Sequence, residues 1–153
     1  MLFCQTRIGW RERPFTLYKF RTMSDATDAA GNPLPDADRL TPFGQWLRTW
    51  SLDELPQLWN TLVGDMSLVG PRPERPIFVE QLRQEIRFYD LRHSIKPGVT
   101  GWAQIHHVPE DSLENTVRKL EYDLYYIKHM SPALDMLTMF HTAKAVILRI
   151  GAR

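Results

Sequence analysis

The sequence has a single cysteine, almost no net charge and no long hydrophobic run. Cys4 alone excludes an intramolecular disulfide framework and indicates a reducing compartment. The 19 Lys and Arg residues nearly balance the 18 Asp and Glu residues, and the net charge of +1 argues against a generic binder of polyanions such as nucleic acid. No uninterrupted hydrophobic run exceeds four residues, whereas a membrane span needs about 20. As printed, the sequence therefore predicts neither a membrane span nor an export signal.

The rest of the composition is that of one folded domain over residues 1–153. A chain of this length is close to an average domain, and its 43% hydrophobic residues can bury a core. The charge is unevenly distributed: residues 1–22 carry five basic residues against one acid, and residues 23–41 carry four acids against one arginine. A basic segment suits phosphates or lipid headgroups, although on charge alone a solvated surface is the commoner explanation.

The first part of the chain is typical of a β-hairpin followed by a loop. Leu2–Ile8 and Phe15–Thr22 are predicted strands, and residues 9–13 form the hairpin loop between them. Residues 24–40 have little periodicity and are rich in Asp, Ala, Gly and Pro, which predicts a mobile surface loop, often a lid or a binding loop. Val99–Ile105 is a candidate third strand.

Start signals and helical spacing predict four helices. They run from Pro42, with Thr41 as N-cap, to about Trp50; from Pro76 to about Leu91; from Asp111 or Ser112 to about Lys128; and from Pro132 to about Arg149. On the third helix, the inward residues are expected to be Leu113, Val117, Leu120, Leu124 and Ile127. The class is therefore α+β, a helix-dominated single domain with a small N-terminal β-hairpin and amphipathic, interfacial helices.

The aromatic residues have two interpretations. By default Trp10, Trp46, Trp50 and Trp59 are expected mostly in the core. Trp46 and Trp50, which are four residues apart, could instead rest at a membrane interface, and the last helix is either core or interfacial. The histidines do not favour a metal site, because His106 and His107 point to opposite faces of any strand and no helix carries a second His at i+4.

The adjacent acids Asp53 and Glu54 also have two interpretations. Ser51 and Glu54 have the spacing of a capping box, which would explain both acids structurally. Pro56 disturbs a helix that starts at Ser51, so the helix is alternatively expected to start nearer Pro56 with both acids at its mouth. There a carboxylate stays ionised and can act as a nucleophile or as a ligand of a hard metal ion.

Two arginines near these acids are candidate phosphate ligands. Arg48 precedes Asp53 by five residues, and Arg72 is flanked by Pro71 and Pro73, which stiffen its backbone. A guanidinium on a stiff backbone loses little entropy when it binds a phosphate, but a proline-rich turn with a surface arginine explains the pattern equally well.

Five ordered motifs, spread over nearly the whole chain, resemble the bacterial sugar transferase family, the monotopic polyprenyl-phosphate phosphoglycosyl transferases. The segment Leu120–Lys128 matches as well. The five motifs are the segments Phe15–Met23, Thr41–Gly44, Ser51–Asn60, Gly64–Pro73 and Lys96–Gln104. Five motifs in the right order are far more specific than any one of them, and the resemblance makes a catalytic role for Asp53 and Glu54 the favoured interpretation.

The resemblance implies a two-step reaction with a UDP-sugar donor and a polyprenyl phosphate acceptor, usually undecaprenyl phosphate. Asp53 would attack the β-phosphate, expel UMP and form a covalent phosphosugar-aspartate, from which the lipid phosphate takes the phosphosugar. Glu54 would hold Mg²⁺, and Lys19, Arg48 and Arg72 occupy the family's basic positions and would contact phosphate. The reaction would be the first membrane step of exopolysaccharide or glycan assembly.

The resemblance also implies a place and a missing part. Members of the family carry a hydrophobic N-terminal membrane segment before the basic strand, whereas this sequence begins directly with the part of the family that contains Met1–Cys4. We therefore expect a catalytic domain without that segment, at the cytoplasmic face of the bacterial inner membrane. The sugar and the oligomeric state are left open. Two alternatives use the same residues differently: a Mg²⁺-dependent nucleotide-sugar phosphohydrolase, and a non-enzymatic module that binds membrane surfaces.

Overall fold

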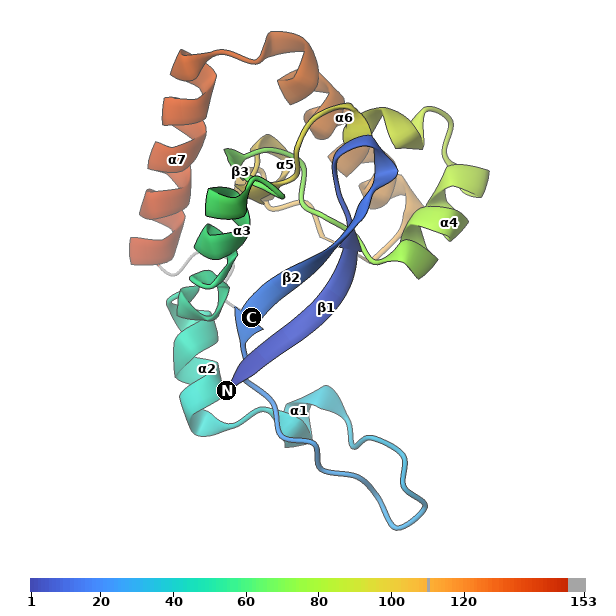
Figure 1. Cartoon of the computed structure of the whole chain (residues 1–153), viewed down its shortest axis with the longest axis vertical. Helices are drawn as coiled ribbons and strands as arrows, with labels where there is room; N and C mark the ends of the chain where they lie inside the picture. Colours follow the sequence, from blue (N-terminus) through green and yellow to red (C-terminus); the bar gives the residue numbers. More distant parts are fainter. Residues whose placement is uncertain (110, 149–153) are drawn as a thin grey trace.

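A two-stranded antiparallel hairpin opens the chain and runs through the middle of the molecule in the computed structural model, which describes residues 1–109 and 111–148 (Figure 1). β1 (Leu2–Ile8) pairs with β2 (Pro14–Phe20), in a register that sets Leu2 opposite Phe20. The short 3₁₀ helix η1 (Trp10–Glu12) turns the chain between them. Both predicted strands are confirmed, the second ending two residues early.

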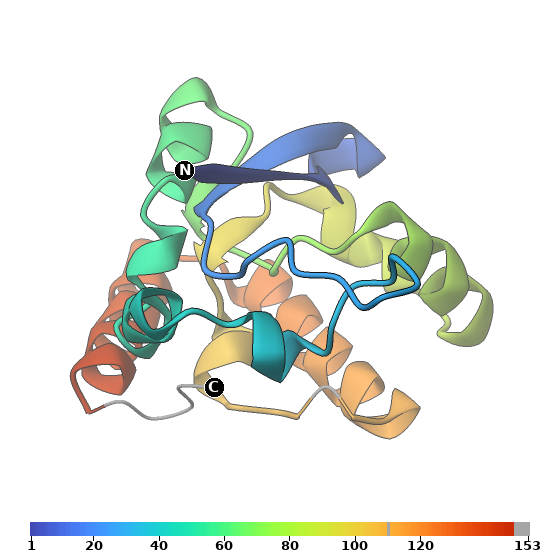
Figure 2. The ribbon, with the colours of Figure 1, turned by 90° about the horizontal axis from the view of Figure 1, so that it is seen from below.

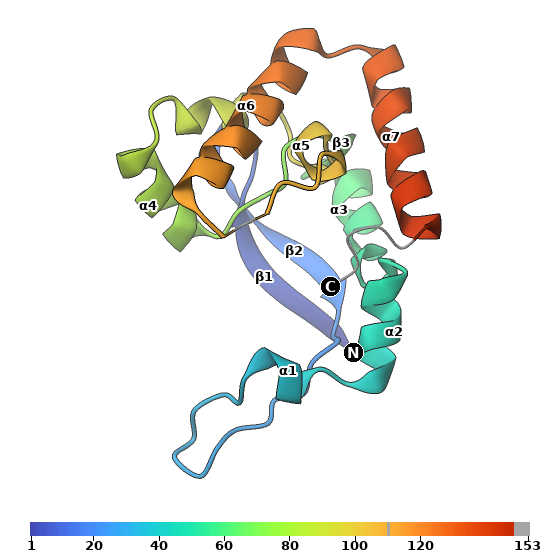
Figure 3. The same ribbon diagram turned by 180° about the vertical axis from the view of Figure 1, so that it is seen from behind.

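The segment after β2 is less irregular than the sequence predicts. Strand-like bridges join Met23 to Leu40 and Thr27 to Pro33, and the short helix α1 (Asp36–Arg39) follows. Backbone pairing between its two arms therefore gives this segment more local structure than the sequence predicts, while its predicted mobility stays a prediction. This segment projects away from the rest of the molecule (Figures 1 and 3).

The next helices carry the acidic pair. α2 (Pro42–Thr49) begins as predicted, with the Thr41 hydroxyl accepting a hydrogen bond from the Gly44 N–H. Ser51 adopts a left-handed backbone (φ 53°) and its side chain makes no cap hydrogen bond, so the predicted capping box is wrong. A 3₁₀ turn, η2 (Leu52–Glu54), precedes α3 (Gln57–Val63), whose N-cap is Pro56. The alternative start near Pro56 is confirmed.

Two short parallel strands form the second sheet. β3 (Ser67–Val69) pairs with β4 (Gly98–Thr100), and the short helix α5 (Trp102–Ile105) follows β4 directly. The predicted strand Val99–Ile105 is therefore right only at its start, because Gly101 caps a helix there. The two strands approach so closely that a Cβ on Gly98 would lie 2.1 Å from the Gly70 nitrogen, which leaves room only for glycine at position 98.

The remaining helices surround the hairpin. α4 (Pro76–Glu85) ends before the predicted Leu91, because Ile86 is extended and Phe88 is left-handed (φ 65°), and η3 (Tyr89–Ser94) follows. α6 (Leu113–His129) and α7 (Pro132–Ile147) are capped by Ser112 and Ser131 as predicted. The predicted end at Arg149 lies outside the described residues.

The core lies between α4, η3 and α6, where it is formed by Val79, Ile86, Tyr89 and Leu120. Of the five residues expected inside α6, Leu113 and Val117 are exposed. The expectation that the tryptophans lie mostly in the core is wrong for Trp10, Trp46 and Trp59, which are exposed. Within residues 1–109 and 111–148, no helix is both long and apolar enough to cross a bilayer.

Candidate active site

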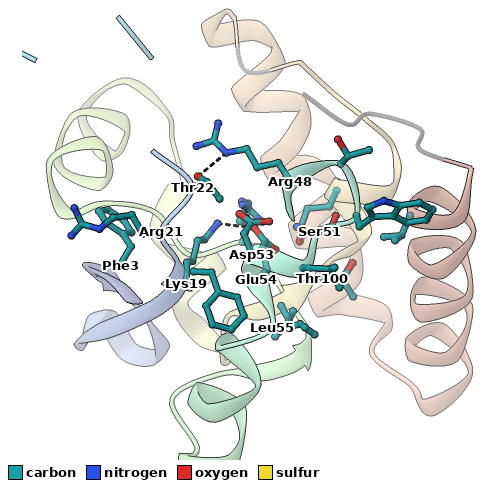
Figure 4. Close-up of a pocket in the computed structure, with 18 of the residues that line it drawn as sticks. Phe3, Lys19, Arg21, Thr22, Arg48, Ser51, Asp53, Glu54, Leu55 and Thr100 are labelled. Atoms are coloured by element: carbon teal, nitrogen blue, oxygen red, sulfur yellow. Dashed lines mark hydrogen bonds and ion pairs between the residues drawn. The ribbon is translucent and has the colours of Figure 1, made fainter. Parts of the chain in front are cut away.

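All five residues that the sequence singles out line one cavity of about 1020 Å³. The cavity lies between the end of β2, the α2–η2 segment, the turn after β3 and α7. Asp53 and Glu54 lie near its centre, the Lys19 side chain points toward them, and the Arg48 guanidinium is turned toward Thr22 (Figure 4). Residues from distant parts of the chain are thus brought to one place.

Glu54 is the electrostatic centre of the cavity. Its Oε1 atom accepts hydrogen bonds from the Lys19 Nζ and from the Arg72 Nη2, each at 2.7 Å. Burial alone would raise the pKa of Glu54, but the charges of Arg72 and Lys19 outweigh burial and lower it to about 2. Glu54 is therefore ionised at neutral pH and holds two cations at the cavity floor.

Asp53 has a different environment from its neighbour. Burial, and then the negative charge of Glu54, raise the pKa of Asp53 above its ordinary value, while the charges of Lys19 and Arg48 oppose this rise. The direction of this pKa shift is opposite to that expected of a carboxylate in a first helical turn, because burial and the charge of Glu54 outweigh the nearby cations. A more basic carboxylate is also a stronger nucleophile.

The positions of the two flanking cations follow from local geometry. Lys19 is on β2, and burial lowers its pKa although Glu54 and Asp53 favour the charged form. The Arg48 Nε donates a 3.1 Å hydrogen bond to the buried Thr22 hydroxyl at the end of that strand. This contact requires glycine at 44, where a Cβ would lie 2.0 Å from the Thr22 carbonyl oxygen.

Two further residues of the site were not predicted individually. Asn60 is fully buried; its Nδ2 donates to the Thr16 carbonyl (2.7 Å) and its Oδ1 accepts from the Tyr18 N–H (3.2 Å), which fixes α3 against β2. Gln104 lines the cavity, and its buried Oε1 has no hydrogen-bond partner among the described residues. Both lie in the family-like motifs, but nothing in the sequence indicates the partners of Asn60 or the place of Gln104 in the cavity lining.

The donor set at the acidic pair fits a magnesium ion. Mg²⁺ prefers carboxylate oxygens and commonly uses one or two of them together with substrate phosphates. Lys19 and Arg72 both contact Oε1 of Glu54, so Oε2 and the carboxylate of Asp53 are the oxygens that could coordinate the ion. The chemistry of these oxygens is suitable for a hard cation.

One other group of potential metal ligands lies among the described residues, at Glu12, Asp90 and His93. The Arg83 Nη2 donates 2.9 Å hydrogen bonds to both carboxylates of this group. A cation of the protein itself, the Arg83 guanidinium, therefore already contacts both carboxylates.

Two adjacent carboxylates with three cations around them suit chemistry on phosphate groups. Residues 1–149 match the family model described as bacterial sugar transferase. The chain belongs to this family, and the resemblance seen in the sequence is confirmed.

Curated relatives agree with this assignment. One relative is the UDP-N-acetylgalactosamine-undecaprenyl-phosphate N-acetylgalactosaminephosphotransferase of Aeromonas hydrophila. It is 44% identical to this chain, over all of this chain and 37% of its own length. The uncharacterized sugar transferase EpsL of Bacillus subtilis (strain 168) is 45% identical over 99% of this chain and 72% of its own. The UDP-glucose:undecaprenyl-phosphate glucose-1-phosphate transferase of Escherichia coli (strain K12) is 42% identical over 93% of this chain and 32% of its own. The chain thus spans about a third of the first and third relatives.

Proposed function

We propose that this chain is the catalytic domain of a phosphoglycosyl transferase that moves a sugar 1-phosphate from a UDP-sugar to undecaprenyl phosphate. The observation that carries the proposal is the position of Asp53, which lies beside Glu54 in a cavity ringed by Lys19, Arg48 and Arg72. The names of the relatives from Aeromonas hydrophila and Escherichia coli both specify a UDP-sugar and undecaprenyl phosphate, which supports the same substrates here.

Asp53 is the proposed nucleophile. An Oδ atom attacks the β-phosphorus of the donor, the bond from that phosphorus to the bridging oxygen breaks, and UMP leaves with the electron pair. An oxygen of the lipid phosphate then attacks the same phosphorus and displaces the Asp53 carboxylate. Neither step needs an external oxidant or reductant, and the covalent intermediate lets two bulky substrates use one phosphate site in turn.

The cations counter the charge of these anionic reactants. Lys19 and Arg72, which contact Glu54 in this structure, would bind the donor diphosphate, and Arg48, which donates to the Thr22 hydroxyl, would contact it as well. Glu54, with Asp53, would hold Mg²⁺, which when bound neutralises charge on the diphosphate. Cations that bridge developing charge in phosphoryl transfer contribute about 10³ to 10⁵ in rate.

A membrane surface is the proposed location of the acceptor. α2, α3 and α7 lie on one side of the molecule in all three ribbon views (Figures 1, 2 and 3). We call their exposed large side chains the apolar face: Phe43, Trp46, Leu58, Trp59, Leu62, Val63, Met136, Leu137, Phe140, Ile147 and Leu148. Leu58 also lines the cavity, so the apolar face reaches the site. This arrangement suits a lipid substrate at the cytoplasmic face of the inner membrane.

The test uses the full-length protein that contains this chain, a panel of UDP-sugars labelled in the sugar, and Mg²⁺. We expect UMP release with label retained on the denatured protein, and loss of both in Asp53→Ala. The control is Asp65→Ala, an exposed acid outside the cavity lining. Turnover to water without trapped label would indicate a phosphohydrolase instead, and no Mg²⁺-dependent UMP release with any donor would leave only a membrane-binding module.

A further inference from the structure

The turn that carries Arg72 is held through its carbonyl groups. Four successive carbonyls accept hydrogen bonds from four different donors: Pro71 from the Gly98 N–H (2.9 Å), Arg72 from the Arg92 guanidinium (2.9 Å), Pro73 from the Arg7 guanidinium (3.0 Å) and Glu74 from the Ile8 N–H (2.9 Å). Two of the four residues are prolines without an N–H, so the turn cannot stabilise itself as helix or sheet. Its shape is therefore set by the elements around it.

Of the two guanidinium donors, Arg92 is more deeply buried than Arg7. Its side chain is 6% exposed and pairs with Asp123 of α6, which is 2% exposed, at 2.9 Å. Its Nη1 also donates a 2.6 Å hydrogen bond to the Tyr89 hydroxyl. Three fixed partners on η3, α6 and the turn leave the guanidinium little freedom, and its fork geometry suits such a set of acceptors.

The contact to Arg72 connects this buried pair to the active site. The Arg92 Nη2 holds the Arg72 main chain, and the Arg72 Nη2 in turn lies 2.7 Å from Glu54. Arg92 itself does not line the catalytic cavity; it borders a second, smaller cavity of about 270 Å³ on the other side of the turn. Any influence of Arg92 on the reaction must therefore pass through Arg72.

We propose that Arg92, with Asp123 as its counter-ion, is a positioning residue that fixes the main chain of Arg72 so that the Arg72 guanidinium points at the phosphate site. The proposal rests on the proposed function, since Arg72 is assigned there to the donor diphosphate. Misplacement of a catalytic group by about 1 Å can lower a rate by about 10²-fold. A buried pair used for general stability alone would change the rate only through the fraction folded.

The test is a double-mutant cycle in the full-length protein. Arg92→Lys keeps the charge that Asp123 needs but cannot satisfy three partners as the guanidinium does. We expect it to lower the rate of UMP release at saturating donor by about 10-fold in the wild-type background, and by less than about 2-fold in the Arg72→Ala background, because the group it positions is gone. Its effect on the midpoint of thermal unfolding should be the same in both backgrounds.

Arg83→Lys is the matched control. Arg83 also bridges two carboxylates, Glu12 and Asp90, but it has no contact with the Arg72 turn. We expect its rate to stay within about 2-fold of wild type. An equal loss of rate for Arg92→Lys in both backgrounds, or no loss in either, would overturn the proposal.

The positioning role and the proposed function can fail separately. If the wild-type protein releases no UMP, the proposed function fails, and crystal structures of wild type and Arg92→Lys then decide the positioning role. We expect the contact between Arg72 Nη2 and Glu54 Oε1 to be lost in the variant. A structure in which Arg92→Lys leaves that contact unchanged would refute the positioning role.

Discussion

The buried side chain of Asn60 holds α3 against β2. With 0% exposure, its amide satisfies a carbonyl and an N–H of β2, the strand that carries Lys19. The amide group thus replaces a neighbouring strand along this part of the edge of β2. Because both β2 groups face the interior at Asn60, water cannot readily replace the amide.

We predict that Asn60→Ala lowers the free energy of unfolding by about 2 to 4 kcal/mol, since it leaves two backbone groups unpaired and opens a small cavity. Urea unfolding measures this change. Asn32→Ala, at an exposed position, is the matched control and should change stability by less than about 0.5 kcal/mol. A loss below about 1 kcal/mol for Asn60→Ala would show that the two β2 groups find other partners.

The stability of the fold depends on pH through His93. Burial, and then the charge of Arg92, lower the pKa of His93 to about 4. Its unfolded pKa is about 6.5, so between pH 6.5 and pH 4 the unfolded chain binds a proton that the folded chain does not. The contribution of His93 to stability is therefore present above pH 6.5 and is lost as the pH falls toward 4.

We predict that His93→Gln flattens the pH dependence of stability in this window, by up to about 3 kcal/mol between its ends. Urea unfolding from pH 7 to pH 4 measures the slope, with the exposed His129→Gln as the matched control. The same slope in wild type and His93→Gln would contradict the assignment of this acid sensitivity to His93.

The site could be predicted from the sequence as a set of residues but not as a set of contacts. The motif residues Lys19, Arg48, Asp53, Glu54 and Arg72 do meet in one cavity. Their partners could not be predicted, because the pair from Lys19 to Glu54 joins residues 35 apart and the pair from Arg72 to Glu54 joins residues 18 apart. Contacts between residues so far apart in the sequence depend on the complete tertiary structure.

At the scale of elements, local signals predicted helix starts better than helix ends. The caps at Thr41, Ser112 and Ser131 formed because one hydroxyl and an N–H three residues later suffice. The end of α4 was placed too late, since apolar spacing continues past Glu85 while the left-handed Phe88 redirects the backbone. No local pattern marks that residue.

At position 44, helix propensity and packing favour different residues. Alanine is the better helix former by about 1 kcal/mol, yet a Cβ at 44 would lie 2.0 Å from the Thr22 carbonyl oxygen. We predict that Gly44→Ala destabilises the protein by about 1 to 3 kcal/mol and lowers the rate of UMP release, because α2 must move and carries Arg48 away from Thr22.

Urea unfolding and the UMP assay measure both effects of Gly44→Ala. Gln45→Ala, exposed on the same helix, is the control and should leave both within error. A stabilised Gly44→Ala variant would mean that propensity outweighs the close approach.

At the scale of the whole molecule, the apolar face makes a prediction about lipid binding. Leu62 is 77% exposed and lies on α3 within that face. We predict that Leu62→Glu lowers the fraction bound to vesicles of phosphatidylethanolamine and phosphatidylglycerol by about 10-fold, since burial of a leucine is worth about 1.5 to 3 kcal/mol. Co-sedimentation with vesicles measures the bound fraction.

The control for this prediction is Leu91→Glu. Leu91 is 50% exposed and lies on η3, near α4 and away from the apolar face (Figure 1). Both changes add the same charge, so net repulsion from anionic lipid affects them equally. Equal losses for the two variants would show that charge alone, and not the apolar face, governs binding.

The way in which the Arg72 turn is held has a consequence for the order of folding. Its carbonyl partners come from Arg7, Ile8, Arg92 and Gly98, and Arg92 itself needs Asp123. During synthesis, the acidic pair is complete long before Asp123 leaves the ribosome. Contacts between distant residues form late, so a growing chain carries both carboxylates before it has a fixed Arg72. A fixed Arg72 beside the acidic pair therefore requires most of the domain to have been made.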